Sequence, residues 1–250
     1  MPSEKTLAIV LRVTDFSETS CVVTLFTRDF GKIGALAKGA RRAKSPFESA
    51  LDVLSVCRIV FIHKSSDSLH LLTEAKLDRR FRSASRNLSR LYAGYYVAEL
   101  LNELTDVGDP HPDLFVIADQ TMQAIDGQGN LAREVLRFEL TALRILGHAP
   151  SLVECVGCGQ VVEHADRIGF GQLAGGVLCA TCRVGRRKVV SVSGPVIDTL
   201  KVFAEPDEDR WRNDDVDQRV LGELRGVMNH YFNNLLGHRL RTQALLGTLA

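Results

Sequence analysis

The chain has 250 residues, of which 45% are hydrophobic and 24% are charged, and its formal net charge is +1. This composition is ordinary for a globular protein of about two domains, and no apolar run approaches the length that would cross a bilayer. The near-neutral total hides an asymmetry, because residues 1–90 carry 16 Lys and Arg against 9 Asp and Glu, whereas residues 91–250 carry 15 against 21.

A basic first part beside an acidic second part favours a nucleic-acid surface on the first domain, although surface charges also segregate by chance. Five strand-like runs occupy this first part, separated by turns that contain Gly, Asp, Ser or Pro. They cover residues 6–13, 21–27, 32–40, 52–63 and 69–76. Five strands that close on themselves predict an OB-type β-barrel.

Strand alternation sorts the faces of the second and third strands. It places Cys21, Val23 and Leu25 inside, with Ile33, Ala35 and Ala37 facing them. Leu7, Ile9 and Leu11 share one side of the first strand. The outward set is then Arg12, Phe26, Lys32 and Lys38, followed by a loop with Arg41, Arg42 and Lys44. Cations that follow phosphates beside an aromatic ring are typical of single-strand binding, and a solvated charged face is the alternative.

From about residue 85 the apolar spacing becomes helical. Start and stop signals such as Pro112 and Gly127 predict helices near residues 85–104, 110–125, 130–146, 193–203 and 220–236. An acidic loop at 205–217 has the composition of a solvated loop rather than of a two-metal nuclease site. Because the chain contains no P-loop motif, we expect no nucleotide hydrolysis.

The predicted helix at 130–146 carries three arginines in one stripe, bordered by leucines. They are Arg133, Arg137 and Arg144, beside Leu136, Leu140 and Leu143. Such a stripe can hold an acidic, hydrophobic peptide end. The alternative is a core helix whose arginines extend to water, and the sequence alone favours it.

Two C-x-x-C pairs form the most specific pattern in the chain. Cys155 and Cys158 make one knuckle, and Cys179 and Cys182 make the other. This spacing predicts one zinc ion in a closed sulfur shell, which holds shape and leaves no position for water. A disulfide pair fits less well, because the opening residues contain no apolar leader and reduced cysteines are expected in the cytosol. Cys21 and Cys57 are expected to be small buried residues.

Several segments in this order resemble the bacterial recombination mediator RecO family along nearly the whole chain. The barrel contributes Leu25-Phe26-Thr27, Gly31-Lys32-Ile33 and Lys38 to Arg42, and the helical part contributes Phe138-Glu139-Leu140 and Leu146 to Pro150 before the two knuckles. The resemblance implies a multidomain α+β protein. An N-terminal OB-fold would span residues 1–80, and a C-terminal α-helical domain would span 81–250, with a zinc ribbon of four cysteines inserted at 151–188.

The resemblance also implies a function without catalysis. Members of the family bind single- and double-stranded DNA and anneal complementary strands. They assist RecA loading onto DNA coated with single-strand-binding protein (SSB), with RecR as partner. We therefore expect a cytoplasmic, nucleoid-associated bacterial protein of recombinational DNA repair. The alternatives are a metal-dependent nuclease and a protein-binding scaffold with incidental DNA contact.

Carried onto this chain, the resemblance assigns two sets of contact residues besides the metal ligands. The expected DNA contacts are Arg12, Phe26, Lys32, Lys38, Arg41, Arg42, Lys44 and Arg79. The expected contacts with the acidic C-terminal tail of SSB are Arg133, Leu136, Arg137, Leu140, Leu143 and Arg144.

Overall fold

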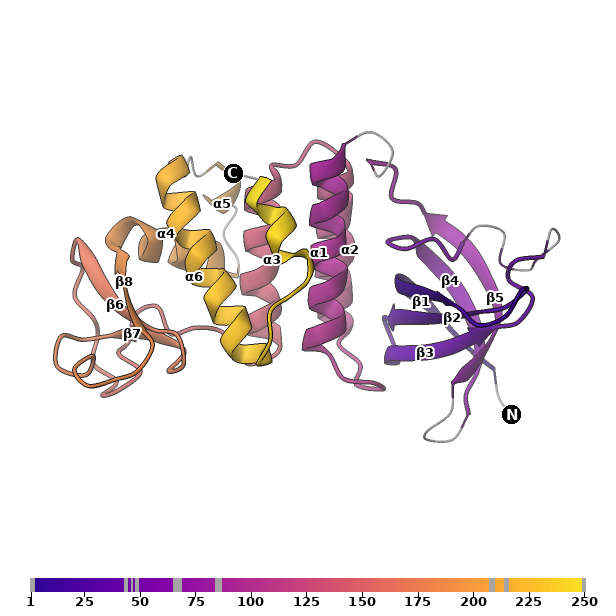
Figure 1. Ribbon diagram of the computed structural model, residues 1–250, viewed down its shortest axis with the longest axis horizontal. Helices are drawn as coiled ribbons and strands as arrows, with labels where there is room; N and C mark the ends of the chain where they lie inside the picture. Colours follow the sequence, from indigo (N-terminus) through magenta and orange to yellow (C-terminus); the bar gives the residue numbers. More distant parts are fainter. Residues whose placement is uncertain are drawn as a thin grey trace. The chain divides into compact units, whose positions relative to one another are not determined.

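The computed structural model describes residues 3–42, 45, 47, 50–64, 69–83, 87–206, 210–213 and 216–248. Contacts divide the chain into two compact units, Met1–Gly129 and Asn130–Ala250. The first unit holds a β-barrel followed by two helices, and the second holds further helices and a small sheet (Figure 1). The domain boundary predicted after residue 80 lies next to the end of the last barrel strand.

In the described part of the first unit, five strands form a closed barrel in the order β1-β2-β3-β5-β4. The pairings are antiparallel except between β3 and β5, which run parallel. The strands are β1 (Ser3–Asp15), β2 (Cys21–Thr27), β3 (Gly31–Ala37), β4 (Val56–Ile62) and β5 (His70–Arg79). The five predicted strands are confirmed, and closure leaves no free sheet edge in this barrel.

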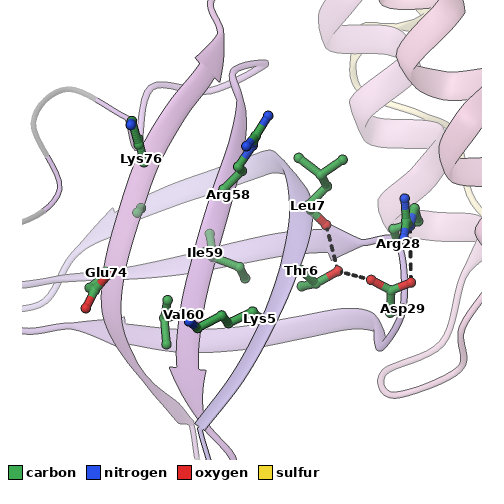
Figure 2. Close-up of a pocket in the computed structure, with 11 residues that line it drawn as sticks. Lys5, Thr6, Leu7, Arg28, Asp29, Arg58, Ile59, Val60, Glu74 and Lys76 are labelled. Carbon is green, nitrogen blue, oxygen red and sulfur yellow. Dashed lines mark hydrogen bonds and ion pairs between the residues drawn. The ribbon is translucent and has the colours of Figure 1, made fainter.

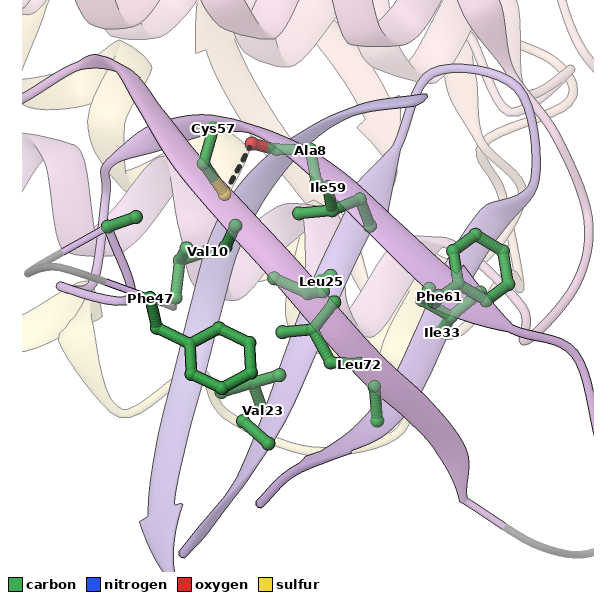
Figure 3. Close-up of a cluster of buried hydrophobic side chains, with 14 of the residues drawn as sticks. Ala8, Val10, Val23, Leu25, Ile33, Phe47, Cys57, Ile59, Phe61 and Leu72 are labelled. Atoms are coloured by element: carbon green, nitrogen blue, oxygen red, sulfur yellow. Dashed lines mark hydrogen bonds between the residues drawn. The ribbon is translucent and has the colours of Figure 1, made fainter. Parts of the chain in front are cut away.

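The barrel interior is filled by small and branched apolar side chains from every strand (Figure 3). Cys57 is fully buried there, and its thiol donates to the carbonyl of Ala8 at 3.7 Å. Burial raises the pKa of Cys57 to about 12. The inward residues predicted for β2 and β3 are confirmed, as are the buried positions of Cys21 and Cys57.

The first strand changes face along its length. Ala8 and Val10 point into the barrel core, and a bulge between Val10 and Arg12 resets the alternation so that Val13 packs against the same core. Ile9 and Leu11 are also buried, but they are not members of the interior cluster.

Two helices complete the first unit, α1 (Leu88–Leu104) and α2 (Pro112–Asp126). Asn87 caps α1 by accepting from the backbone N–H of Arg90, and α2 begins with proline at its first position. The helices pack against each other, and α1 also contacts β1. The outer side of the barrel is therefore partly covered by the unit's own helices.

The second unit is built from α3 (Leu131–Ile145), α4 (Gly194–Ala204), α5 (Arg210–Asn213) and α6 (Gln218–Leu236), with a 3-10 segment at Thr242–Thr248. Its sheet has the order β7-β6-β8, from β6 (Arg167–Gly171), β7 (Gly176–Leu178) and β8 (Val189–Ser193). The five predicted helices are confirmed, whereas α5 and β8 were not predicted.

The acidic loop at 205–217 is described in part, because residues 207–209 and 214–215 lie outside the described residues. Trp211 of α5 is buried there, and Asp217 caps α6 by accepting from the backbone N–H of Arg219 at 2.7 Å. Across the described helices of both units, none is long and apolar enough to span a lipid bilayer.

Candidate nucleic-acid interface and metal centre

A basic loop follows β3 at one end of the barrel. Gly39 has a φ of +71°, a left-handed conformation that side chains disfavour, and it turns the chain so that the N–H of Arg42 donates to its carbonyl at 3.1 Å. Lys38, Arg41 and Arg42 are all exposed around this turn. Three predicted DNA contacts therefore lie together on the surface.

The β1–β2 loop is fastened to this basic loop. The N–H of Arg41 donates to the carbonyl of Thr19 at 3.1 Å, and the N–H of Gly39 donates to the hydroxyl of Ser20 at 3.3 Å. The guanidinium of Arg41 also pairs with the carboxylate of Asp15. These contacts fix the two loops as one rim of the barrel.

Arg12 lies on β1, three residues before Asp15. It lies opposite Thr24 on β2, just beyond the bulge, and its side chain is exposed. Arg12, Lys38, Arg41 and Arg42 are called the basic rim below. The remaining predicted contact in this region, Lys44, lies outside the described residues.

Phe26 and Lys32 lie at the other end of the β2–β3 hairpin, where they pair with each other across the strands. Six residues at about 3.3 Å each separate Lys32 from Lys38, or about 20 Å along the strand. The prediction that Phe26 faces solvent is wrong. Its side chain is fully buried and its ring lies 6.1 Å from the ring of Phe115 in α2.

Lys32 also contacts the helical part of the first unit. Its ammonium donates to the carbonyl of Asn102 at 2.5 Å, and its own carbonyl accepts from the N–H of Gly108 at 2.9 Å. Burial lowers the pKa of Lys32, against the opposing effect of Glu103 and Asp106. The connection between α1 and α2 thus covers this end of the hairpin, and Lys32 is not presented to a phosphate.

Arg79, another predicted DNA contact, forms an ion pair within the protein. Its guanidinium pairs with the carboxylate of Asp119 in α2, and both side chains are largely buried. This ion pair fastens the last barrel strand to the helices. A phosphate would have to displace Asp119 to reach it, so Arg79 is a weaker candidate for DNA contact than the exposed cations.

A hollow of about 650 Å³ lies elsewhere on the barrel, over β1, β4 and β5 and beside the β2–β3 turn (Figure 2). Lys5, Arg28, Arg58 and Lys76 line it together with Asp29 and Glu74, and two of the four cations are in ion pairs. Arg28 pairs with Asp29 at 3.1 Å, and Arg58 pairs with Asp78 at 3.0 Å. The basic rim, with three of its four cations outside any described ion pair, is the stronger candidate for binding a polyanion.

The leucines of the stripe predicted on α3 do not lie on the surface. Leu136, Leu140 and Leu143 are 1%, 2% and 0% exposed, so they belong to the core of the second unit. Arg137 donates to the carbonyls of Phe203 and Glu205, both at 2.6 Å. The alternative of a core helix is confirmed for these leucines.

The two other arginines of the stripe differ from each other. Arg133 donates to the carbonyl of Arg212 at 2.8 Å, which ties α3 to α5. Arg144 is exposed at the last turn of α3. Of the six residues predicted for the peptide contact, Arg144 is therefore the one whose side chain is mainly accessible.

The four predicted metal ligands converge in the second unit. The sulfur atoms of Cys155, Cys158, Cys179 and Cys182 all lie within 4.8 Å of one another, and Cys158 Sγ is 4.0 Å from Cys179 Sγ. A tetrahedral zinc site with bonds of about 2.3 Å has sulfur–sulfur edges of about 3.8 Å. Among the described residues this is the one cluster of three or more potential metal ligands, and it can hold a metal ion.

Backbone N–H groups point at two of these sulfur atoms and favour the thiolate form that binds a cation. The N–H groups of Gly157 and Cys179 point at Cys155 Sγ, each at 3.4 Å, and the N–H of Cys182 points at Cys179 Sγ at the same distance. The Cys179 N–H, with help from Gly157, lowers the pKa of Cys155 to about 6. Hydrogen bonds to neighbouring sulfurs, Cys179 first, raise the pKa of Cys182 to about 12, because they favour its protonated form.

Comparison with known proteins agrees with this architecture. Residues 1–81 match the family model "Recombination protein O N terminal", and residues 85–244 match "Recombination protein O C terminal". The "DNA repair protein RecO" of Rhodopirellula baltica is 43% identical, with 96% of this chain and 97% of that protein covered. Proteins of the same name from Moorella thermoacetica and Myxococcus xanthus are 28% and 29% identical over 96% and 94% of the chain, and over 89% and 93% of their own lengths. The chain belongs to the Recombination protein O family.

Proposed function

We propose that this protein is a DNA-binding recombination mediator of recombinational DNA repair, and that it works without catalysing a covalent step. The observation that carries the proposal is the basic rim: four exposed cations on a closed five-stranded barrel, three in the loop after β3 and one on β1. The relatives named DNA repair proteins support the same role.

The barrel is assigned to the OB-fold. Its strand order of β1-β2-β3-β5-β4, with a parallel β3–β5 pair, supports that assignment. OB-folds bind single strands with cationic grooves and exposed aromatic rings, and loops at the barrel rim commonly contribute. The loops that carry the basic rim lie at such a position on this barrel.

Annealing follows from charge screening. Two single strands repel each other through their phosphates, and the cations of the rim lower that repulsion so that complementary bases can meet. Duplex DNA presents the same phosphates, so the rim binds both single- and double-stranded DNA. Zinc in the four-cysteine cluster is structural, because four sulfur ligands leave no open position for water.

The wider role of the protein is to help RecA load onto DNA coated with single-strand-binding protein, together with RecR, in the bacterial cytoplasm at the nucleoid. Arg144 is the accessible residue of α3 that can meet an acidic protein tail. Nucleotides and membranes have no part in this function.

The decisive experiment is a strand-annealing assay on the purified protein, without ATP and with or without single-strand-binding protein. We expect annealing, and a binding constant that falls steeply with salt concentration. Replacing Lys38, Arg41 and Arg42 together by Ala should lower the annealing rate and flatten the salt dependence. Unchanged binding in the triple variant would reject this site, and sustained cleavage of labelled DNA with divalent metal would point to a nuclease instead.

A further inference from the structure

The β1–β2 loop presents an aromatic ring to solvent. Phe16 is 63% exposed, which makes it the most exposed aromatic side chain among the described residues. A single exposed apolar residue is common on protein surfaces, so exposure alone says little about function. The informative feature is that Phe16 directly follows Asp15, the partner of Arg41 in the basic rim.

Two sets of contacts hold Phe16 in place. Within its own loop, the N–H groups of Phe16 and Ser17 both donate to the carbonyl of Ser20 at 3.1 Å. Its chain neighbour Asp15 pairs with Arg41 of the basic rim. The backbone at Phe16 is therefore tied to the loop that carries the cations, and it has little freedom left to lose on binding.

We infer that Phe16 is a stacking platform for one unpaired base, and that it gives the basic rim a preference for single-stranded nucleic acid. The inference rests on the proposed function and adds the element that Phe26, buried under α2, does not supply. The cations bind phosphates of any sequence and strandedness. A ring can stack only on a base that has left its neighbours, which an unpaired strand offers at lower cost than a duplex.

The direct test compares oligothymidylate with an abasic strand of the same length, which keeps the phosphates and lacks the bases. Phe16→Ala should weaken oligothymidylate binding by roughly 5- to 150-fold, the range for losing one stacked base. Its affinity for the abasic strand and for duplex should stay within twofold of the original protein, and so should the salt dependence. Phe16→Tyr should restore oligothymidylate binding.

A matched control removes an exposed apolar side chain from the other unit. Leu173 is 59% exposed in the turn between β6 and β7, and Leu173→Ala should leave both affinities unchanged. A fluorescent version uses Phe16→Trp. Its emission should be quenched by oligothymidylate and unaffected by the abasic strand, against the background of Trp211, the single native tryptophan, which is buried.

The outcomes separate this inference from the proposed function. If Phe16→Ala binds oligothymidylate as tightly as the original protein, or loses the abasic strand equally, the stacking role is wrong. The basic rim itself fails only if the triple variant of Lys38, Arg41 and Arg42 keeps its full salt dependence on both strands. A flattened salt dependence in the triple variant with no effect of Phe16→Ala would overturn the stacking role and leave the rim intact.

Discussion

Lys32 donates from its ammonium to the carbonyl of Asn102, 2.5 Å away in the last turn of α1. The last carbonyls of a helix lack intrahelical partners and carry partial negative charge, so a cation there stabilises the helix end. The same residue was predicted to bind DNA from its place on an outward strand face. Its partner comes from a helix 70 residues further along the chain.

We expect Lys32→Met to lower the stability of the protein rather than its DNA binding. The variant keeps an apolar stem and loses the charged hydrogen bond, at a cost of about 1–2 kcal/mol in the free energy of unfolding. Urea unfolding and salt-dependent DNA binding measure the two properties. Lys38→Ala is the matched control and should show the reverse pattern. If DNA binding lost its salt dependence equally in both variants, Lys32 would be a DNA contact after all.

Asp15 restrains the basic rim by pairing with Arg41. Asp15→Asn should release the guanidinium and remove a negative charge from the binding surface, so DNA affinity should rise, by roughly two- to fivefold for an exposed charge. Asp78→Asn, which removes the partner of Arg58 elsewhere on the barrel, changes the net charge equally. A similar rise in both variants would mean that total charge, not the rim, sets the affinity.

Arg137 is expected to stabilise the second unit. Its guanidinium donates to the carbonyls of Phe203 and Glu205 and also to that of Pro206 at 3.0 Å, so it holds the chain that leaves α4. Arg137→Ala should lower the free energy of unfolding by roughly 1.5–3 kcal/mol, while Arg144→Ala, at an exposed position, should change it by about 0.5 kcal/mol or less. If thermal unfolding showed that the two variants lose equal stability, the hydrogen bonds of Arg137 to these carbonyls would not contribute to the free energy of unfolding.

His70 gives the barrel a pH dependence. Burial, aided by the nearby His63, lowers the pKa of His70 below its usual 6.5, and its Nδ1 accepts from the N–H of Lys64 at 3.2 Å. A lowered histidine pKa means that the unfolded chain binds the proton more tightly. The stabilising contribution is therefore complete above pH 6.5 and is lost as the pH falls through the folded pKa.

His70→Asn should flatten the stability profile below pH 6.5, because the Asn side chain offers an oxygen near the position of Nδ1 and does not titrate. Urea unfolding at a series of pH values, followed by a barrel-specific signal, measures this. His230→Asn, in the other unit, serves as the control and should leave the barrel's profile unchanged. A profile in His70→Asn as steep as in the original protein would assign the acid sensitivity to other groups.

The sequence predicted most where the relevant partners are neighbours in the chain. Each C-x-x-C pair is local, and both knuckles came together as expected. Strand alternation likewise placed the interior residues of β2 and β3 correctly. In β1 the bulge broke the alternation, and nothing in the residues near Val10 marks it.

The errors share one physical cause, which is docking between distant segments. Phe26 does point away from the barrel core, as alternation requires, yet α2 covers it. The arginines of α3 do form a stripe, but the partners of Arg133 and Arg137 are carbonyls 66 to 79 residues further on. Local periodicity gives the direction of a side chain and contains no information on which element will cover it.

If the four-cysteine cluster holds one zinc ion, the metal should control how many cysteines react with an alkylating reagent. Of the six cysteines, Cys21 and Cys57 are buried in the barrel, where burial raises the pKa of both, and the other four form the cluster that can hold a metal ion. Thiolates react with iodoacetamide and thiols do not, and bound zinc protects its ligands. We expect the zinc-loaded protein to resist alkylation at all six positions.

Removing zinc with a chelator should open the cluster to alkylation, with Cys155 (pKa about 6) reacting first at neutral pH and Cys182 (pKa about 12) last, and only denaturation should add Cys21 and Cys57, as mass spectrometry can count. Because zinc displaces protons from its ligands, loss of the metal should also become easier as the pH falls. Cys158→Ser should bind zinc more weakly and release it faster to a chromogenic chelator, with Cys21→Ser as the control that keeps one zinc per chain. Rapid alkylation of two cysteines in the loaded protein would instead mean that the four sulfurs do not share one ion.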